Sequence, residues 1–327
     1  MLRGAGRQPT SGVDEGSRMT YLTHDVPVAS GLMRVGEWRP DEVDAPVILA
    51  LHGMTSTHHV WSTLAEQLPD VRIIAPDLRG RGLSNDLTGP YGVAQHTSDA
   101  RAVMRALGIT RATVLGHSLG AFVAVELLAR DAAESSTGAA GGGVFERGVL
   151  VDGGLPVTVP LNHSEADLLE AVLGAGARGF TLSFADRAMN RKFWSLHPAL
   201  SAAWSPALAA YADTHVTEYL TAEGAIELQL AVSPDALAAD SRELFGSTAA
   251  RAALDRVRVP LTVLTAGRGL LNESPGVYTP REIDGWKLEL PHVRFVELHT
   301  VNHYTTVLGE QGVAALAHAL QRTLLSS

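Results

Sequence analysis

The sequence predicts an α/β fold: a mostly parallel central sheet with flanking helices and an inserted helical cap. One observation is an alternation of short apolar runs with helical patterns over residues 47–128, joined by short connections. Another is that residues 155–256 carry helical patterns without a clear strand. About a hundred such residues are more than a crossover between two strands requires. We therefore expect residues 20–154 and 257–327 to form the core and residues 155–256 to form the cap.

The first part of the chain is expected to lead into a buried sheet. Residues 1–19 hold no apolar run of secretory-signal length and are expected to form a disordered tail. Two extended stretches that meet at Ser30-Gly31 predict an antiparallel edge hairpin. The elements expected next are buried strands at 47–51 and 71–75 and helices over 60–68 and 93–107.

The second part is expected to contain the cap and to complete the sheet. A Ser/Gly/Ala-rich stretch at 134–143 predicts a surface loop before the next strand at 149–151. Helical patterns in the cap cover residues 166–173, 180–194, 198–220, 225–232 and 234–245. The core then resumes with strands at 261–265 and 293–298, separated by a long loop over 266–292, and closes with a helix over 310–324.

Composition excludes several classes of function. A formal net charge of −9 does not favour a nucleic-acid or anionic-membrane surface, and no apolar stretch is long enough to span a bilayer. The absence of cysteine removes disulfides, thiolate metal sites and cysteine nucleophiles. We find neither a metal-ligand spacing nor a dinucleotide fingerprint, so we expect no metal and no cofactor. We expect a cytoplasmic protein without nucleic-acid or membrane partners, and a homo-oligomer is compatible with the sequence.

The segment 112–128 contains the best candidate for a reactive side chain. A β-branched run leads into Gly116-His117-Ser118-Leu119-Gly120, and a helical pattern of small apolar residues follows at once. Glycines two residues before and after Ser118 allow strand and helix to approach closely and the serine to adopt a strained backbone conformation. The spacing therefore predicts a nucleophilic serine exposed at the carboxyl end of a strand, above a helix N-terminus.

A serine hydroxyl needs an imidazole to accept its proton. Among thirteen histidines, His303 directly follows the last predicted strand, and a parallel sheet returns that strand end to the edge that carries Ser118. His117 is adjacent to the serine and is expected to pack, because neighbouring side chains on a tight turn diverge. We expect His52 and His299 to be mainly structural.

The negative oxygen of a tetrahedral intermediate needs preorganised donors, which are usually main-chain N–H groups. The N–H of Leu119 is expected to supply one, since Leu119 is the first residue of the helix. The N–H of Met54, in the loop after the strand at 47–51, is expected to supply the other.

Together these motifs resemble the α/β-hydrolase superfamily. The resemblance rests on His52-Gly53, the stretch PDLRGRGLS at 76–84, the turn GHSLG at 116–120, the cap and the terminal Asn302-His303-Tyr304. It covers about residues 20–324 and is closest to bacterial esterase and lactone-hydrolase branches, with a helical cap over the core. The serine separates the chain from relatives of this fold that use an aspartate nucleophile.

The resemblance also implies an acid that orients His303. Many relatives place an aspartate just after the strand matched by residues 261–265, but this chain has no carboxylate there before Glu273. Other members place the acid after the preceding strand, where this chain has Asp152. We therefore expect Asp152 to be the acid, with Glu273 as the alternative.

These observations predict a cofactor-independent serine hydrolase that cleaves an ester or lactone of a hydrophobic small molecule through an acyl-enzyme. The apolar, aromatic-rich cap suggests a hydrophobic substrate bound between cap and core. Carbon–carbon bond hydrolysis of a diketone-like substrate and a receptor without turnover are the alternatives. The residues expected to bind substrate are His52, Trp61, Leu155, Phe184, Trp194 and Tyr304.

Overall fold

The protein is described by a computed structural model that covers residues 19–39, 41, 44–138, 143–156, 183–221, 224–246 and 249–325. The expected N-terminal tail, apart from Met19, and the expected helix over 166–173 lie outside the described residues.

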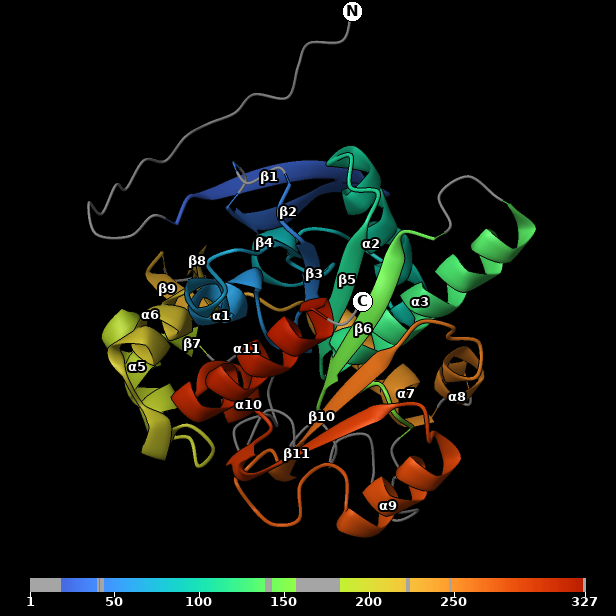
Figure 1. The fold of residues 1–327 in the computed structure, drawn as a ribbon. Helices are drawn as coiled ribbons and strands as arrows, with labels where there is room; N and C mark the ends of the chain where they lie inside the picture. Colours follow the sequence, from blue (N-terminus) through green and yellow to red (C-terminus); the bar gives the residue numbers. More distant parts are fainter. Residues whose placement is uncertain are drawn as a thin grey trace, which may run out of the picture.

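A central sheet of eight strands organises the molecule (Figure 1). The order of the strands is β1-β2-β4-β3-β5-β6-β10-β11. β1 and β2 form the predicted edge hairpin, β2 is antiparallel to β4, and the remaining neighbours are parallel. The mostly parallel sheet with flanking helices is thereby confirmed. The strands are β1 (Tyr21–Val28), β2 (Gly31–Trp38), β3 (Val47–Leu51), β4 (Arg72–Pro76), β5 (Ala112–His117), β6 (Phe145–Val151), β10 (Leu261–Arg268) and β11 (Arg294–Asn302).

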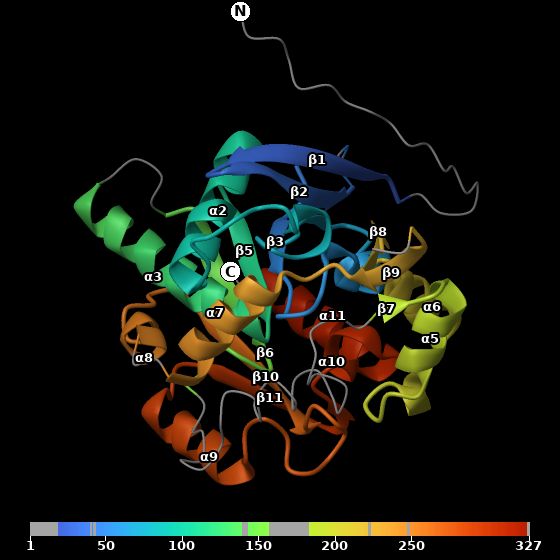
Figure 2. The ribbon, with the colours of Figure 1, turned by 180° about the vertical axis from the view of Figure 1, so that it is seen from behind.

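Helices cover both faces of the sheet, as the two opposite views show (Figures 1 and 2). On one face α2 (Val93–Ala106), α3 (Leu119–Thr137) and α8 (Ala249–Leu254) pack over one hydrophobic cluster. On the other face α1 (Ser62–Gln67) and α11 (Glu310–Leu325) pack over a second cluster. All six residues of β5 are buried because the sheet is covered on both sides. Shorter elements are the 3-10 turns His58–Trp61, Gly82–Ser84 and Ser201–Ala203, and the helix α10 (Thr305–Leu308).

The inserted segment, meaning the described part of residues 155–256, differs from the purely helical prediction. It contains a three-stranded sheet of order β7-β9-β8 beside its helices. The predicted helices over 198–220 and 225–232 are wrong at their strand portions, where two runs pair as an antiparallel hairpin, Val216 opposite Leu230. Along Thr-Glu-Tyr-Leu of the first run, more buried and more exposed side chains alternate, which fits a strand once a partner strand supplies the hydrogen bonds. The elements are β7 (Ser183–Phe184), α5 (Arg187–Ser195), α6 (Pro206–Asp213), β8 (Val216–Leu220), β9 (Ile226–Leu230) and α7 (Pro234–Gly246).

Two predicted loops are also partly helical. The long loop over 266–292 contains α9 (Pro280–Glu289), which begins with a capping box between Thr279 and Glu282. The Ser/Gly/Ala-rich stretch starts inside α3, which continues to Thr137 and ends at Gly138 with a left-handed backbone. A local capping signal thus sets the start of α9 and the end of α3.

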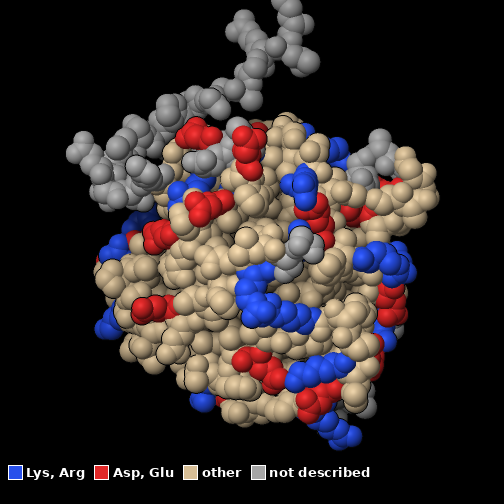
Figure 3. Space-filling model, in the orientation of Figure 1, with Lys and Arg blue, Asp and Glu red and all other residues tan. Residues whose placement is uncertain are grey.

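Acidic and basic side chains are interspersed with neutral ones on the face shown in Figure 3. Several of them pair across elements, for example Lys287 on α9 with Glu297 on β11 at 2.5 Å. Among the described residues, no helix combines the length and the apolar character needed to cross a bilayer.

Candidate active site

The turn between β5 and α3 presents Ser118. Its backbone has φ 54° and ψ −119°, a strained region for a residue with a side chain. A Cβ at Gly116 would lie 2.2 Å from the carbonyl oxygen of Gly120, and one at Gly120 would lie 2.1 Å from that of Leu51. Strand, helix and the neighbouring β3 are therefore too close for side chains at these two positions. The strand, tight turn and helix predicted around Ser118 are all present.

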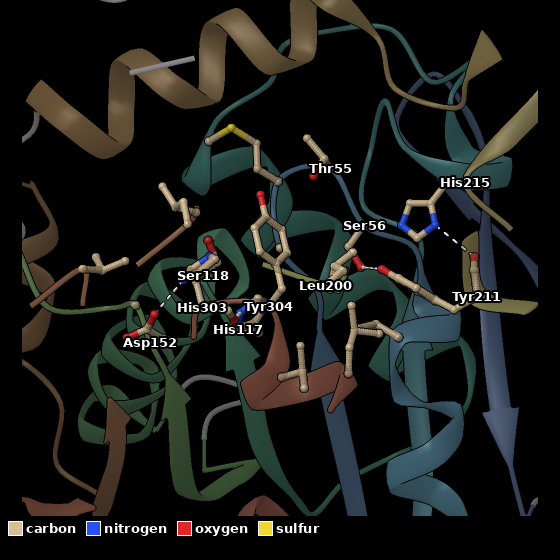
Figure 4. A pocket seen from close by; sticks show the side chains of 18 of the residues that line it. Thr55, Ser56, His117, Ser118, Asp152, Leu200, Tyr211, His215, His303 and Tyr304 are labelled. Atoms are coloured by element: carbon tan, nitrogen blue, oxygen red, sulfur yellow. Dashed lines mark hydrogen bonds and ion pairs between the residues drawn. The ribbon is translucent and has the colours of Figure 1, made fainter. Parts of the chain in front are cut away.

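His303 and Asp152 meet at the carboxyl end of the sheet (Figure 4). His303 follows β11, and Asp152 follows β6 with φ 45°. The Nδ1–H of His303 donates a hydrogen bond of 2.7 Å to Oδ2 of Asp152. Because this bond fixes the proton on Nδ1, Nε2 keeps its lone pair. The other carboxylate oxygen of Asp152 accepts from the main-chain N–H of Ala266 at 3.0 Å, which holds the carboxylate in place.

Glu273, the alternative acid, lies elsewhere. It is exposed, and its carboxylate accepts from the N–H of Leu271 at 2.7 Å, within its own loop. The carboxylate that hydrogen-bonds His303 is that of Asp152.

The peptide between Gly53 and Met54 is held in one orientation. Its carbonyl oxygen, on Gly53, accepts from Nδ1–H of His52 at 2.7 Å and from the N–H of Ser56 at 3.2 Å. The N–H of Met54 points the opposite way, since the peptide is planar and trans. Within the described part of the chain, neither the N–H of Met54 nor that of Leu119 donates to a protein acceptor. Gly53 and Met54 line the same cavity as Ser118, and Leu119 is fully buried directly after the serine.

The His52 ring bridges this peptide and the main chain of Leu78 through two hydrogen bonds. Its Nε2 accepts from the N–H of Leu78 at 2.9 Å, so both ring nitrogens are used. Burial lowers the pKa of the His52 imidazole to about 3, and the ring is therefore neutral near pH 7. His52 does not line the cavity, so its prediction as a substrate-binding residue is wrong; it orients a main-chain group instead.

Comparison with known proteins decides the family. A model described as the alpha/beta hydrolase family matches residues 48–319. The chain belongs to the α/β hydrolase family. The lipase LipV of Mycobacterium tuberculosis is 37% identical over 82 residues, which are 25% of this chain and 31% of the lipase. An uncharacterised protein of Mycobacterium bovis is 37% identical over 82 residues, 25% of this chain and 24% of that protein. The matched region thus spans a third or less of these curated relatives.

Solved structures share the fold of this α/β hydrolase over almost its whole length. E-2-(acetamidomethylene)succinate hydrolase has a TM-score of 0.71 at 21% identity, with 92% of this chain and 100% of that chain covered. A thioesterase domain from the curacin biosynthetic pathway has a TM-score of 0.67 at 17% identity, with 92% and 99% covered. At these identities the likeness concerns the fold alone.

Ser118 lines a cavity of about 120 Å³ in this α/β hydrolase. The residues predicted to bind substrate divide into two groups. Trp194 and Tyr304 line the cavity. Trp61 lies in the hydrophobic cluster under α1 and α11, Leu155 in the cluster under α2 and α3, and Phe184 packs with Val216 and Leu228 inside the inserted segment. Those three predictions are wrong because each side chain completes a core.

Sequence reasoning missed most of the lining that the inserted segment contributes. Leu208, Tyr211, Ala212 and His215 line the cavity from α6 and the residues just after it. Their spacing of i, i+3, i+4 and i+7 is a helical face, and Ser205-Pro206 marks where the helix starts. That signal could have identified the face. Other lining residues from the core are Ser56, Val60, Phe122, Val277, Tyr278 and Val307.

Arg81 connects the Met54 loop to the inserted segment. Its Nε–H donates to the carbonyl oxygen of Met54 at 2.9 Å, and its Nη1 pairs with Asp240 of α7 at 2.5 Å. Both side chains are completely buried. Asp240 also accepts from the N–H of Gly92 at 2.8 Å and lies 3.0 Å from Nε2 of His96. The stretch at 76–84 was recognised as a motif, but this buried ion pair depends on residues far apart in the sequence.

His117 and His215, which both line the cavity, stay uncharged near pH 7. Burial, with His303 nearby, lowers the pKa of His117 well below its usual range, and burial lowers the pKa of His215 to about 4. Among the described residues, no group of three His, Asp or Glu side chains is arranged as metal ligands. The site therefore offers a hydroxyl, an imidazole with an oriented proton and two main-chain donors in a mainly apolar cavity.

Proposed function

We propose that this α/β hydrolase is a serine hydrolase that cleaves an ester or lactone of a hydrophobic small molecule through an acyl-enzyme. The observation that carries the proposal is the hydrogen bond of 2.7 Å from His303 to Asp152 beside Ser118 on its strained turn. This arrangement leaves Nε2 of His303 as the base for the serine hydroxyl.

In the first step Oγ of Ser118 attacks the carbonyl carbon while Nε2 of His303 takes the hydroxyl proton. The carbonyl oxygen becomes negative and is stabilised by the N–H groups of Met54 and Leu119. The ionised carboxylate of Asp152 stabilises the imidazolium that forms. Collapse of the intermediate breaks the carbon–oxygen bond, and His303 returns the proton to the leaving alcohol.

In the second step water replaces the alcohol. His303 takes one proton from water, the hydroxide oxygen bonds to the acyl carbon, and the bond to Oγ of Ser118 breaks. The proton returns to Ser118 and the acid is released. No residue beyond those named is needed to balance protons.

The cavity supports a hydrophobic substrate. Residues of the inserted segment, including Trp194, Trp204 and Leu208, line it together with the core residue Phe122. An apolar wall with few polar groups is typical of small-molecule sites. We infer that residues 155–256 act as a cap over Ser118.

A fluorophosphonate probe tests the nucleophile. We expect covalent labelling of the wild type and none of Ser118→Ala, and labelling that persists in the variant would remove Ser118 from this role. A panel of esters, lactones and vinylogous diketones, with products identified by mass, tests the bond that is cleaved. Turnover of the diketones alone would favour carbon–carbon bond hydrolysis. No turnover, together with a ligand that raises the melting temperature, would favour a receptor.

A further inference from the structure

The cavity has a second polar region away from Ser118. Ser56, Tyr211 and His215 lie on the opposite side of Tyr304 from Ser118, His303 and Asp152 in Figure 4. All three line the cavity. The hydrolytic chemistry proposed above does not use their side chains, so these polar side-chain atoms need another explanation.

His215 presents a hydrogen-bond acceptor. Its Nδ1–H donates to the main-chain carbonyl of Tyr211 at 3.0 Å, which fixes the proton on Nδ1. Nε2 therefore keeps a lone pair, and none of the described residues donates a hydrogen bond to it. The ring packs edge-on against the ring of Tyr211 with centroids 4.1 Å apart, which restricts its orientation. Its low pKa keeps the ring in this neutral form at pH 7.

Ser56 and Tyr211 form a pair of hydroxyls beside it. Their oxygens are 2.7 Å apart, and Oγ of Ser56 is also 3.2 Å from the carbonyl oxygen of Thr57. If Ser56 donates to Thr57, Tyr211 donates to Ser56 and the phenolic oxygen remains an acceptor. If Ser56 donates to Tyr211, the phenol remains a donor. The pair can therefore complement a group that both donates and accepts.

The region is uncharged. Burial raises the pKa of Tyr211 above its usual value, so the phenol stays protonated. The described residues that line the cavity include no Lys or Arg, and their carboxylate is that of Asp152, which is bonded to His303. A carboxylate or ammonium group would lose its hydration here without an opposite charge.

We propose that His215, Tyr211 and Ser56 form a subsite for a neutral hydroxyl group at the end of the substrate distant from the scissile bond. That hydroxyl donates to Nε2 of His215 and accepts from the Tyr211–Ser56 pair. The substrate class is then an ester with an apolar middle and a terminal hydroxyl. This inference rests on the proposed function, because Ser118 defines which end carries the scissile carbonyl.

Matched ester pairs test the subsite. For acyl chains of six to ten carbons, each p-nitrophenyl ω-hydroxyalkanoate is compared with the alkanoate that has a methyl in place of the hydroxyl. We expect kcat/KM to favour the hydroxyl by about fivefold or more at the chain length that reaches His215, the effect of one net hydrogen bond. In His215→Phe this ratio should fall to about one, while hydrolysis of the methyl-terminated ester continues.

His197→Phe is the matched control. His197 is a histidine of the same inserted segment with 6% exposure, against 7% for His215, and it does not line the cavity. The control should keep the preference for the hydroxyl. Tyr211→Phe, which removes only the phenolic oxygen, should reduce the preference and gives a second test if His215→Phe does not fold. Equal kcat/KM for both esters at every length, or a preference unchanged in both variants, would overturn the inference.

A binding experiment separates this inference from the proposed function. Affinity of Ser118→Ala for the same ester pairs is measured by calorimetry, where no turnover is needed. We expect Ser118→Ala to bind the hydroxyl ester more tightly, and this difference in affinity should disappear when His215→Phe is added. That result supports the subsite even if the wild type neither hydrolyses esters nor reacts with fluorophosphonate. Equal binding of both esters would overturn the subsite and leave the assignment of Ser118 to its own test.

Discussion

The imidazole of His117 holds the main chain of His303. Its Nε2–H donates to the carbonyl oxygen of His303 at 2.9 Å, and the two rings have centroids 4.7 Å apart. Nδ1 of His117 is buried and has no hydrogen-bond partner among the described residues. The residue next to the proposed nucleophile therefore positions the loop that carries the proposed base.

Replacing His117 by Phe should affect turnover more than stability. The change removes the donor to His303 but also removes a buried nitrogen without a partner, so the free energy of unfolding should change by less than about 1 kcal/mol. We expect kcat to fall about tenfold with KM unchanged. Steady-state kinetics measures kcat and KM, and urea unfolding measures the free energy of unfolding. A loss of several kcal/mol in the free energy of unfolding with kcat unchanged would indicate a purely structural role.

Asp152 and Glu273 should differ sharply in a paired substitution. Asp152→Asn removes the charge that stabilises the imidazolium of His303, and kcat should fall about ten-thousandfold, as for the corresponding change in serine proteases. Glu273→Gln should retain activity within about twofold, since this exposed side chain bonds its own loop. A large loss in Glu273→Gln with an active Asp152→Asn would reverse the assignment.

The strain at Ser118 predicts a stability difference between two inactive variants. Ser118→Ala keeps a Cβ at φ 54°, whereas Ser118→Gly relieves the steric conflict. The glycine variant should have a free energy of unfolding about 1 kcal/mol higher than the alanine variant. Denaturant titration of the two side by side is the measurement, and a less stable glycine variant would contradict this explanation.

The buried pair of Arg81 and Asp240 allows stability to be separated from catalysis. Asp240→Asn leaves the guanidinium without its counter-ion and should destabilise the fold by about 3 kcal/mol. Adding Arg81→Met removes the uncompensated charge and should recover much of that loss. The carbonyl of Met54 then lacks its donor, so kcat should stay about tenfold lower. Recovery of kcat together with stability would confine Arg81 to a structural role.

Buried neutral histidines predict a loss of stability in acid. Burial lowers the folded-state pKa of His52 to about 3 and those of His59 and His215 to about 4, whereas histidine in an unfolded chain titrates near 6.5. Below pH 6.5 the unfolded chain binds more protons, so the free energy of unfolding decreases as pH falls, until the folded-state pKa is reached. Each such histidine contributes a slope of about 1.4 kcal/mol per pH unit.

Unfolding of wild type and His215→Phe at pH values between 6 and 4.5 tests this dependence. The variant lacks one of these protonation sites, so its slope should be shallower by the contribution of one histidine. Identical slopes would show that His215 is protonated in the folded protein.

The central sheet and Ser118 could be predicted because their signals are local. An apolar run as short as Val47–Leu51 implies burial on both faces, and two glycines at fixed spacing imply a tight turn. The position of His303 near Ser118 could be predicted because the carboxyl ends of parallel strands lie at the same edge of a sheet, and both residues follow such strands. The choice between Asp152 and Glu273 depended on resemblance, since which carboxylate meets His303 is decided by the neighbouring strands β6, β10 and β11.

The inserted segment was less predictable because its short elements depend on contacts. Val216–Leu220 holds strand-favouring Val, Thr and Tyr, but at five residues it is too short to stand out, and it becomes a strand by pairing with Ile226–Leu230. Phe184 and Trp194 looked equivalent in the sequence, yet one fills a small core and the other lines the cavity. The capping box before Pro280–Glu289, in contrast, was a readable signal.

Ser56 belongs to two parts of the protein at once. Its N–H fixes the Gly53 carbonyl, and its hydroxyl bonds Tyr211 on α6. In the proposed mechanism, one residue therefore links the subsite for the distant hydroxyl to the peptide that faces the developing negative charge. An engineered change in α6 that accommodates a new substrate is then expected to shift this peptide as well, so that selectivity and turnover change together.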